Sequence, residues 1–258
     1  MTNEHIFEGQ QQEPLVLYPR HANFTDNWFK QPLRPGVIRT YGVGFENGEP
    51  VLRTGNTITG FVPEFVDDQD RYGFMDSRID QGRFRLYENG NLIAERTQFF
   101  GDFPVSGDPA TYRAETEVSR NAPWSVYSSD TDTVWTFKSS APPAGVSQAQ
   151  AILVAGYDLG ELDLLNRAER GSHAIGVTIR RQQLAPPATV TGARLWVSYN
   201  DGATWSRVTL DSQGGGRFTG ELSHPASTAR KYVSLRLEAT DSGGSSLNQT
   251  IIRAYGLQ

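Results

Sequence analysis

Four carboxylates stand close together in the stretch FVDDQDRYGFMD, where their type and spacing suit the chemistry of a metal ion. They are Asp67, Asp68, Asp70 and Asp76. Calcium takes roughly six to eight oxygen ligands, but the full calcium-loop pattern with its distant bidentate glutamate is missing. Arg71 lies in this stretch and Arg78 follows it, and both can neutralise the acids. We therefore expect a loop held by Asp–Arg pairs, with no calcium and no other cofactor bound.

The histidines and serines show none of the spacings that catalytic or zinc sites require. The four histidines are His5, His21, His173 and His224. No H-x-x-x-H pair, G-x-S-x-G elbow or S-x-x-K motif occurs in the sequence. Cysteine is absent, which excludes disulfides, thiolate metal sites and a cysteine nucleophile. We expect each histidine to be an isolated surface or loop residue, no catalytic residue in this chain, and no peptidase or glycosidase activity.

One triplet, Asp241-Ser242-Gly243, matches the D-[ST]-G motif around the catalytic aspartate of one class of serine proteases. The triplet lies in ATDSGGSSLNQT, between two segments that alternate like strands. The histidine and serine motifs that accompany it in such enzymes are missing from the sequence. A hairpin turn is therefore the interpretation that the sequence favours.

The segment SYNDGATW fits the Asp-box pattern S-x-D-x-G-x-T-W of sialidase propeller blades and other β proteins, with asparagine in place of the usual aspartate. Its pattern residues are Ser198, Asn200, Gly202, Thr204 and Trp205. In such a hairpin the short polar side chains bond turn amides and the tryptophan packs under the loop. A propeller needs repeated blades, and this sequence holds one copy. We expect a structural hairpin in which Trp205→Ala costs about 3 to 5 kcal/mol; a sugar-stacking Trp205 is the alternative.

The candidate residues must lie on β-strands or in the loops between them. The apolar residues of the sequence alternate with a period of two, and helical periodicity is nearly absent. In YVSLRLEAT, for example, the apolar residues from Val233 to Ala239 share one face. Asn89-Gly90 and Asn47-Gly48 each predict a two-residue hairpin turn, and Pro50 makes the second one part of an edge strand. The sequence therefore predicts an all-β protein.

A low-complexity stretch, SSAPPAGVSQAQ at residues 139–150, interrupts the strand pattern and predicts a boundary near residue 145. We expect two β-sandwich domains. Residues 1–145 form the first domain, which is jelly-roll-like. The sequence assigns no structure to its initial segment of about 30 residues. Residues 146–258 form the second, with the strand spacing of an immunoglobulin or fibronectin-type sandwich.

The composition of the chain limits the kinds of partner that it can bind. The net charge is -5 and the pI is near 5.4, which argue against binding to a nucleic-acid backbone. No stretch approaches the roughly 18 apolar residues of a membrane span. The initial segment MTNEHIFEGQQQEP has neither a basic start nor an apolar run, so we expect any export signal to lie outside this chain.

The order of several segments resembles the C-terminal region of large secreted subtilisin-like serine proteases of actinobacteria. These segments include GFVPEFVD, RFRLYENGNLIAE, YDLGELDLLNRA, LWVSYNDGATWSRVTL, GGGRFTGELSHP and YVSLRLEATDSGG. The resemblance covers roughly residues 60–258, and Asn200 departs from the family's usual aspartate. It implies an extracellular, non-catalytic accessory region that follows a protease domain and supports it or attaches it to a surface or substrate.

A carbohydrate-binding sandwich, with a cell-surface or polysaccharide ligand, is the alternative function. It requires at least two tryptophan rings that lie coplanar on one open face. The candidates are Trp28, Trp124, Trp135, Trp196 and Trp205. A free-standing hydrolase is disfavoured, because no catalytic constellation is found in the sequence.

Overall fold

The computed structural model describes residues 30–39, 51–121 and 126–258, and every regular element in these ranges is a β-strand. The prediction of an all-β protein is confirmed. In these ranges we find no helix with the length and apolar character that a membrane crossing needs. The hairpin expected at Asn47-Gly48, with Pro50, lies outside the described residues.

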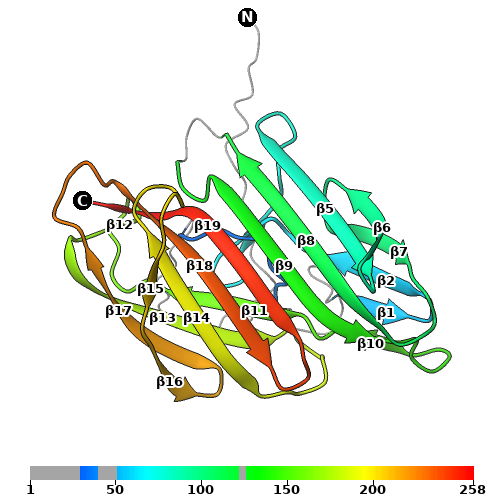
Figure 1. Ribbon diagram of the computed structural model, residues 1–258. Coiled ribbons are helices and arrows are strands. Elements are labelled where there is room, and N and C mark those ends of the chain that lie inside the picture. Colours follow the sequence, from blue (N-terminus) through cyan, green and yellow to red (C-terminus); the bar gives the residue numbers. More distant parts are fainter. Residues whose placement is uncertain (1–29, 40–50, 122–125) are drawn as a thin grey trace, which may run out of the picture.

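A nine-stranded sheet forms one layer of the molecule and runs across the width of Figure 1. Its order is β15 (Ser206–Val208), β14 (Val190–Ser198), β18 (Tyr232–Asp241), β19 (Ser246–Leu257), β9 (Asp130–Ser139), β8 (Ala110–Arg120), β5 (Asp80–Glu88) and β6 (Asn91–Arg96), with β12 (Arg167–Ala168) parallel to β19. All the other neighbours in it are antiparallel.

Two four-stranded sheets cover the inner face of the large sheet (Figure 1). One has the order β10 (Ser147–Ala149), β1 (Leu52–Thr54), β2 (Thr57–Phe61) and β7 (Phe100–Pro104); the other has β11 (Leu153–Asp158), β13 (Gly171–Arg181), β17 (Arg217–His224) and β16 (Leu210–Gly214). A short hairpin of β3 (Phe65–Val66) and β4 (Tyr72–Gly73) completes the described strands.

The alternation in the sequence sets which side chains enter the core. On β18 the side chains of Val233, Leu235, Leu237 and Ala239 are buried. The turn at Asn89-Gly90 joins β5 to β6 with both residues at positive φ, as a two-residue hairpin turn requires. Both features were predicted from the sequence and are confirmed.

The predicted boundary near residue 145 does not separate two sheets. Strand β9 from the first half pairs with β19 from the second half along Asp130–Thr136 and Ser246–Ile252. Residues 147–149 of the expected linker form β10, which pairs with β1. One buried apolar cluster runs through both halves of the chain.

The segment Lys30–Arg39 is bound to both layers at the middle of the large sheet. Its residues 31–38 are all buried. Arg34 exchanges backbone hydrogen bonds with Val66, at 3.2 and 2.9 Å, and its guanidinium donates to the carbonyl oxygens of Val66 and Ala155. Gln249 of β19 donates to the Pro35 carbonyl at 3.2 Å. This segment therefore joins β19 of one layer to β11 of the other.

Replacing Arg34 by methionine is expected to lower the free energy of unfolding by about 3 kcal/mol, because a buried cation that donates to two carbonyl groups is lost. Arg217→Met is the matched control, since Arg217 is exposed on β17. Urea denaturation measures both. Equal stability of the two variants would contradict a role for Arg34 in joining the layers.

Candidate functional site

The four aspartates of the predicted calcium loop do not converge on one point. Asp67 is buried at the start of the β3–β4 turn, and its Oδ1 accepts hydrogen bonds from the amides of Gln69 at 2.8 Å and Arg71 at 2.9 Å. Burial raises the pKa of Asp67 to about 6, although these amide bonds oppose the rise. The carboxylate therefore holds the turn together.

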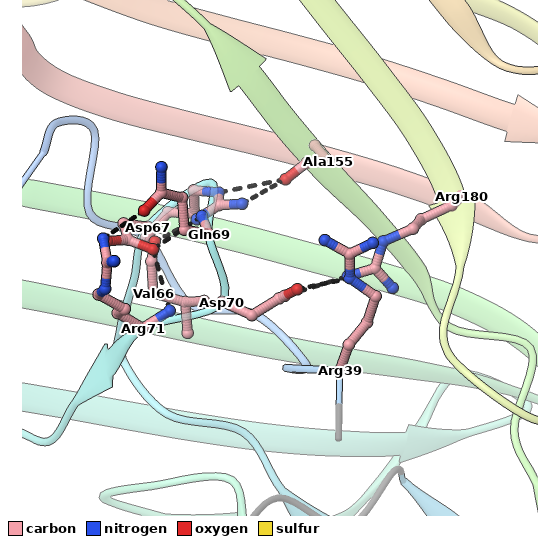
Figure 2. A network of polar contacts seen from close by, with 9 residues as sticks. Arg39, Val66, Asp67, Gln69, Asp70, Arg71, Ala155 and Arg180 are labelled. Carbon is pink, nitrogen blue, oxygen red and sulfur yellow. Dashed lines mark hydrogen bonds and ion pairs between the residues drawn. The ribbon is translucent and has the colours of Figure 1, made fainter. Parts of the chain in front are cut away.

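Asp70 connects this turn to two distant parts of the chain, as Figure 2 shows. Its carboxylate accepts hydrogen bonds from Arg39 Nε at 2.6 Å and from Arg180 Nη2, on β13, at 3.2 Å. Asp70 itself is buried and has φ 62°, the left-handed conformation that aspartate tolerates in turns. Its chemistry is that of an ion-pair junction between the N-terminal segment and a covering sheet.

The other two carboxylates point to separate partners. Asp68 pairs with Lys30 at 3.4 Å, and Asp76 pairs with Arg78 through two bonds from Nε at 2.9 and 3.1 Å. Among the described residues there is no group of three or more His, Asp or Glu side chains placed to hold a metal ion. Asp–Arg pairs do hold this region, but the arginines that bind Asp70 lie far along the chain.

Glu64, a carboxylate buried just before β3, was not predicted from the sequence. Its Oε2 accepts a hydrogen bond from the Met75 amide at 3.2 Å, and it is 1% exposed. Burial, together with the nearby negative charge of Asp80, raises the pKa of Glu64 to about 7. A single acid inside the apolar run GFVPEF was the signal that would have identified it.

The raised pKa of Glu64 predicts that, through this group, acidification favours the folded state. The folded state keeps the proton up to about pH 7, whereas the unfolded chain releases it near its ordinary pKa of 4.5. The stabilisation is therefore complete below pH 4.5 and is lost as the pH rises through 7, by roughly 2 to 3 kcal/mol. Because the lowered pKa of His224 acts in the opposite sense, the difference between proteins is the measure: thermal melting between pH 4.5 and 7.5 should show the wild type losing stability relative to Glu64→Gln as the pH rises. Glu161→Gln, at an exposed position, is the control; an identical profile for all three proteins would refute the assignment.

The Asp-box residues close a hairpin between β14 and β15. Ser198 Oγ accepts a hydrogen bond from the Gly202 amide at 3.0 Å, and Asn200 Oδ1 accepts one from the Thr204 amide at 3.0 Å. Asn200 Nδ2 also donates to Thr204 Oγ1 at 2.9 Å. An aspartate here would accept a hydrogen bond from the Thr204 hydroxyl instead, so asparagine keeps this contact of the Asp-box with the donor reversed.

Trp205 lies beneath this turn and is half-buried. A Cβ atom on Gly202, which has φ 83°, would lie 3.2 Å from Cζ2 of the indole, so glycine lets the turn sit directly on the ring. On β18 the guanidinium of Arg236 lies 4.4 Å from the ring centroid. One face of the ring is thus occupied by an arginine, and the residue is less buried than a core tryptophan.

Because Trp205 is half-buried, Trp205→Ala is expected to lower the free energy of unfolding by about 2 kcal/mol, less than the 3 to 5 kcal/mol typical of a core aromatic. Trp196→Ala is the matched control, because Trp196 is also half-buried but lies on the adjacent strand β14, outside the turn. Guanidinium denaturation measures both variants. A stability equal to wild type in Trp205→Ala would show that the ring does not support the turn.

The remaining tryptophans do not form an open platform in the described part of the chain. Trp135 is buried in the core, and its Nε1 donates to the Leu153 carbonyl at 2.9 Å. On β14 the Arg194 guanidinium lies 5.8 Å from the Trp196 ring centroid. Trp28 and Trp124 lie outside the described residues.

His173 and His224 contact each other, with ring centroids 4.8 Å apart, so the expectation of isolated surface histidines is wrong for this pair. His224 is buried; its Nδ1 lies 3.1 Å from the Tyr199 hydroxyl and its Nε2 lies 3.4 Å from that of Tyr255. Burial and the neighbouring His173 lower the pKa of His224 to about 4. It is therefore a neutral core residue at pH 7. His5 and His21 lie outside the described residues.

The Asp241-Ser242-Gly243 triplet forms the turn between β18 and β19, as the sequence predicted. Asp241 Oδ1 accepts hydrogen bonds from the amides of Gly243 at 2.8 Å and Ser245 at 3.0 Å. Its Oδ2 accepts one from Arg181 Nε at 2.7 Å. Both carboxylate oxygens are thus engaged in holding the turn.

A groove of about 620 Å³ opens between β15 and β17. Its wall includes Tyr199, Arg207 and Glu221. The Tyr199 hydroxyl already contacts His224 and donates to the Ser223 carbonyl at 3.1 Å, and Glu221 accepts a hydrogen bond from Ser172 at 2.6 Å. Two polar groups of this wall, the Tyr199 hydroxyl and the Glu221 carboxylate, are thus engaged with the protein itself.

Comparison with known proteins gives no family for the chain. No protein-family model matches it, and no curated protein does. Among solved structures, the fibronectin(III)-like modules of Clostridium thermocellum CbhA are similar at 11% identity, over 77% of this chain and 86% of that chain, with a TM-score of 0.25. At this identity and TM-score, the similarity assigns no function.

Proposed function

We propose that this chain is a non-catalytic accessory region of an exported subtilisin-like serine protease, and that it supports the protease domain or attaches it to a surface or substrate. The resemblance of residues 60–258 to the C-terminal region of such proteases supports the proposal. So does the engagement of the candidate chemical residues in structural contacts, which Asp70, Asp241 and His224 illustrate.

The observation that carries the proposal is the burial of residues 31–38 across both layers. Arg34 and Pro35 connect this segment to the β3–β4 hairpin, to β11 and to β19. A domain that precedes residue 1 would be connected through residues 1–29 to a segment that is fixed in the body from Gln31 onward. A fixed point of attachment of this kind suits a module that supports or orients an enzyme.

The carbohydrate-binding alternative is less well supported. A sugar platform needs exposed aromatic faces, and in the described residues Trp135 is buried while arginines lie over the rings of Trp196 and Trp205. We therefore favour a protein-supporting role.

The test begins with the reading frame that encodes this chain, which should also encode a subtilisin-like protease domain before residue 1. The parent protease is then compared with a form lacking residues 1–258, in casein hydrolysis and in the half-life of thermal inactivation. We expect faster inactivation or poorer retention on the native substrate in the shortened form, and no casein hydrolysis by residues 1–258 alone. A frame without a protease domain, or hydrolysis by the chain alone that one substitution in it abolishes, would reject the proposal.

A further inference from the structure

The end of β17 is fixed in the protein by a buried cluster of four rings. His224, the last residue of β17, is 3% exposed. Its ring centroid lies 4.8 Å from that of His173 on β13, which belongs to the same covering sheet. It lies 5.8 Å from the ring of Tyr199, next to β14, and 5.7 Å from the ring of Tyr255 on β19. His224 therefore joins a covering sheet to the large sheet.

The hydrogen bonds of this cluster select one neutral tautomer of His224. The Tyr199 hydroxyl donates to the Ser223 carbonyl at 3.1 Å, so its oxygen is left to accept from Nδ1 of His224, also at 3.1 Å. Nε2 is then the nitrogen without a proton, and it accepts from the Tyr255 hydroxyl at 3.4 Å. A proton added to Nε2 would face the hydroxyl hydrogen of Tyr255, for which the described residues provide no other bonded acceptor.

The contacts of His224 in the described residues supply no negative charge to stabilise such a proton. The single acid of β17, Glu221, is exposed and accepts a hydrogen bond from Ser172 at 2.6 Å. The hydroxyls of Tyr199 and Tyr255 stay uncharged, because burial raises the pKa of both. A protonated His224 would therefore be a buried cation without a counter-ion, which is costly in the interior of a protein.

The charged groups that act on His224, His173 and Arg170, are both cationic when protonated. Burial, followed by the charges of His173 and Arg170, lowers the pKa of His224 to about 4 from its ordinary 6.5. A segment that opens and exposes His224 to water restores the ordinary value, so acidification favours opening as the pH falls from 6.5 to 4. At pH 5 the opening equilibrium is raised roughly 30-fold over that at pH 7.5.

The loop that follows His224 depends on one of these cations. Arg170 Nη1 donates to the carbonyl oxygens of Pro225 and Ser227, each at 2.9 Å, and its Nη2 donates to that of Arg230 at 3.2 Å. A positive charge on His224, beside Pro225, repels the guanidinium that makes these bonds. The far end of the loop has a separate attachment, since the Leu257 amide donates to the Lys231 carbonyl at 2.8 Å.

We propose that His224 is an acid-sensitive latch: uptake of a proton by its ring releases the end of β17 and the β17–β18 loop, residues 222–230, while the rest of the sandwich stays folded. This segment is the part of the chain whose contacts converge on His224 and Arg170. Local opening of this kind is a common property of native proteins. The inference does not rest on the proposed function, and either can fail without the other.

Hydrogen exchange with mass spectrometry tests the latch on residues 1–258, at pH 7.5 and pH 5, after correction for intrinsic exchange rates. In wild type we expect the amides of residues 222–230 to lose protection roughly 30-fold at pH 5. Strands β5 and β8, at the far end of the large sheet, are the internal reference and should not lose protection. His224→Phe keeps a ring in the core but takes up no proton, so it should show no loss. His173→Gln is the matched control and should retain most of the loss.

A second measurement needs no variant. In wild-type protein the assigned NMR signals of the His224 ring should remain those of a neutral ring at pH 5 for as long as residues 222–230 are protected. The latch is overturned by a wild-type segment that keeps its protection at pH 5, by an equal loss in β5 and β8, or by an equal loss in His224→Phe. It is also overturned by a loss that disappears in His173→Gln instead, or by a cationic His224 ring in a protected segment. If His224→Phe does not fold, the wild-type exchange and NMR results decide.

Discussion

The guanidinium of Arg34 is the buried polar contact that joins the two layers at the middle of the large sheet. It donates to carbonyl oxygens of Val66 and Ala155, in the β3–β4 hairpin and in β11, while the adjacent Pro35 accepts a hydrogen bond from Gln249 of β19. Water cannot replace these bonds in the interior, so a buried arginine with several acceptors is stable only if the whole set forms together. The segment around Arg34 therefore ties the covering sheets to the large sheet.

The need to pair buried charged groups also explains the role of the acidic β3–β4 turn, which joins distant parts of the chain. Asp70 accepts from Arg39 on this segment and from Arg180 on β13, so one carboxylate extends the connection to a third element (Figure 2). Asp67 uses its oxygens for backbone amides of its own turn. The residues whose spacing suggests metal chemistry are thus engaged in structural contacts.

The strands and their buried faces could be predicted from the sequence, because alternation and turn residues are local properties; Val233–Ala239 and Asn89-Gly90 show this. The pairing of β9 with β19 could not, since no local pattern reveals which edges meet across more than a hundred residues. The partners of Asp70 and the contact between the rings of His173 and His224 were missed for the same reason. Glu64 was overlooked although its apolar surroundings in sequence pointed to burial.

The place of β19 in the large sheet has a consequence for how the chain folds. It is the last described strand, yet it lies between β18 and β9 in the sheet. During synthesis both neighbours must wait with an unpaired edge until residues 246–257 emerge, and exposed strand edges are sites of aggregation. Completion of this sheet is therefore a late event in folding. It is also expected to be slow, because β9 and β19 are far apart in the sequence. Chaperones that cover exposed strand edges should assist it until the final strand is made.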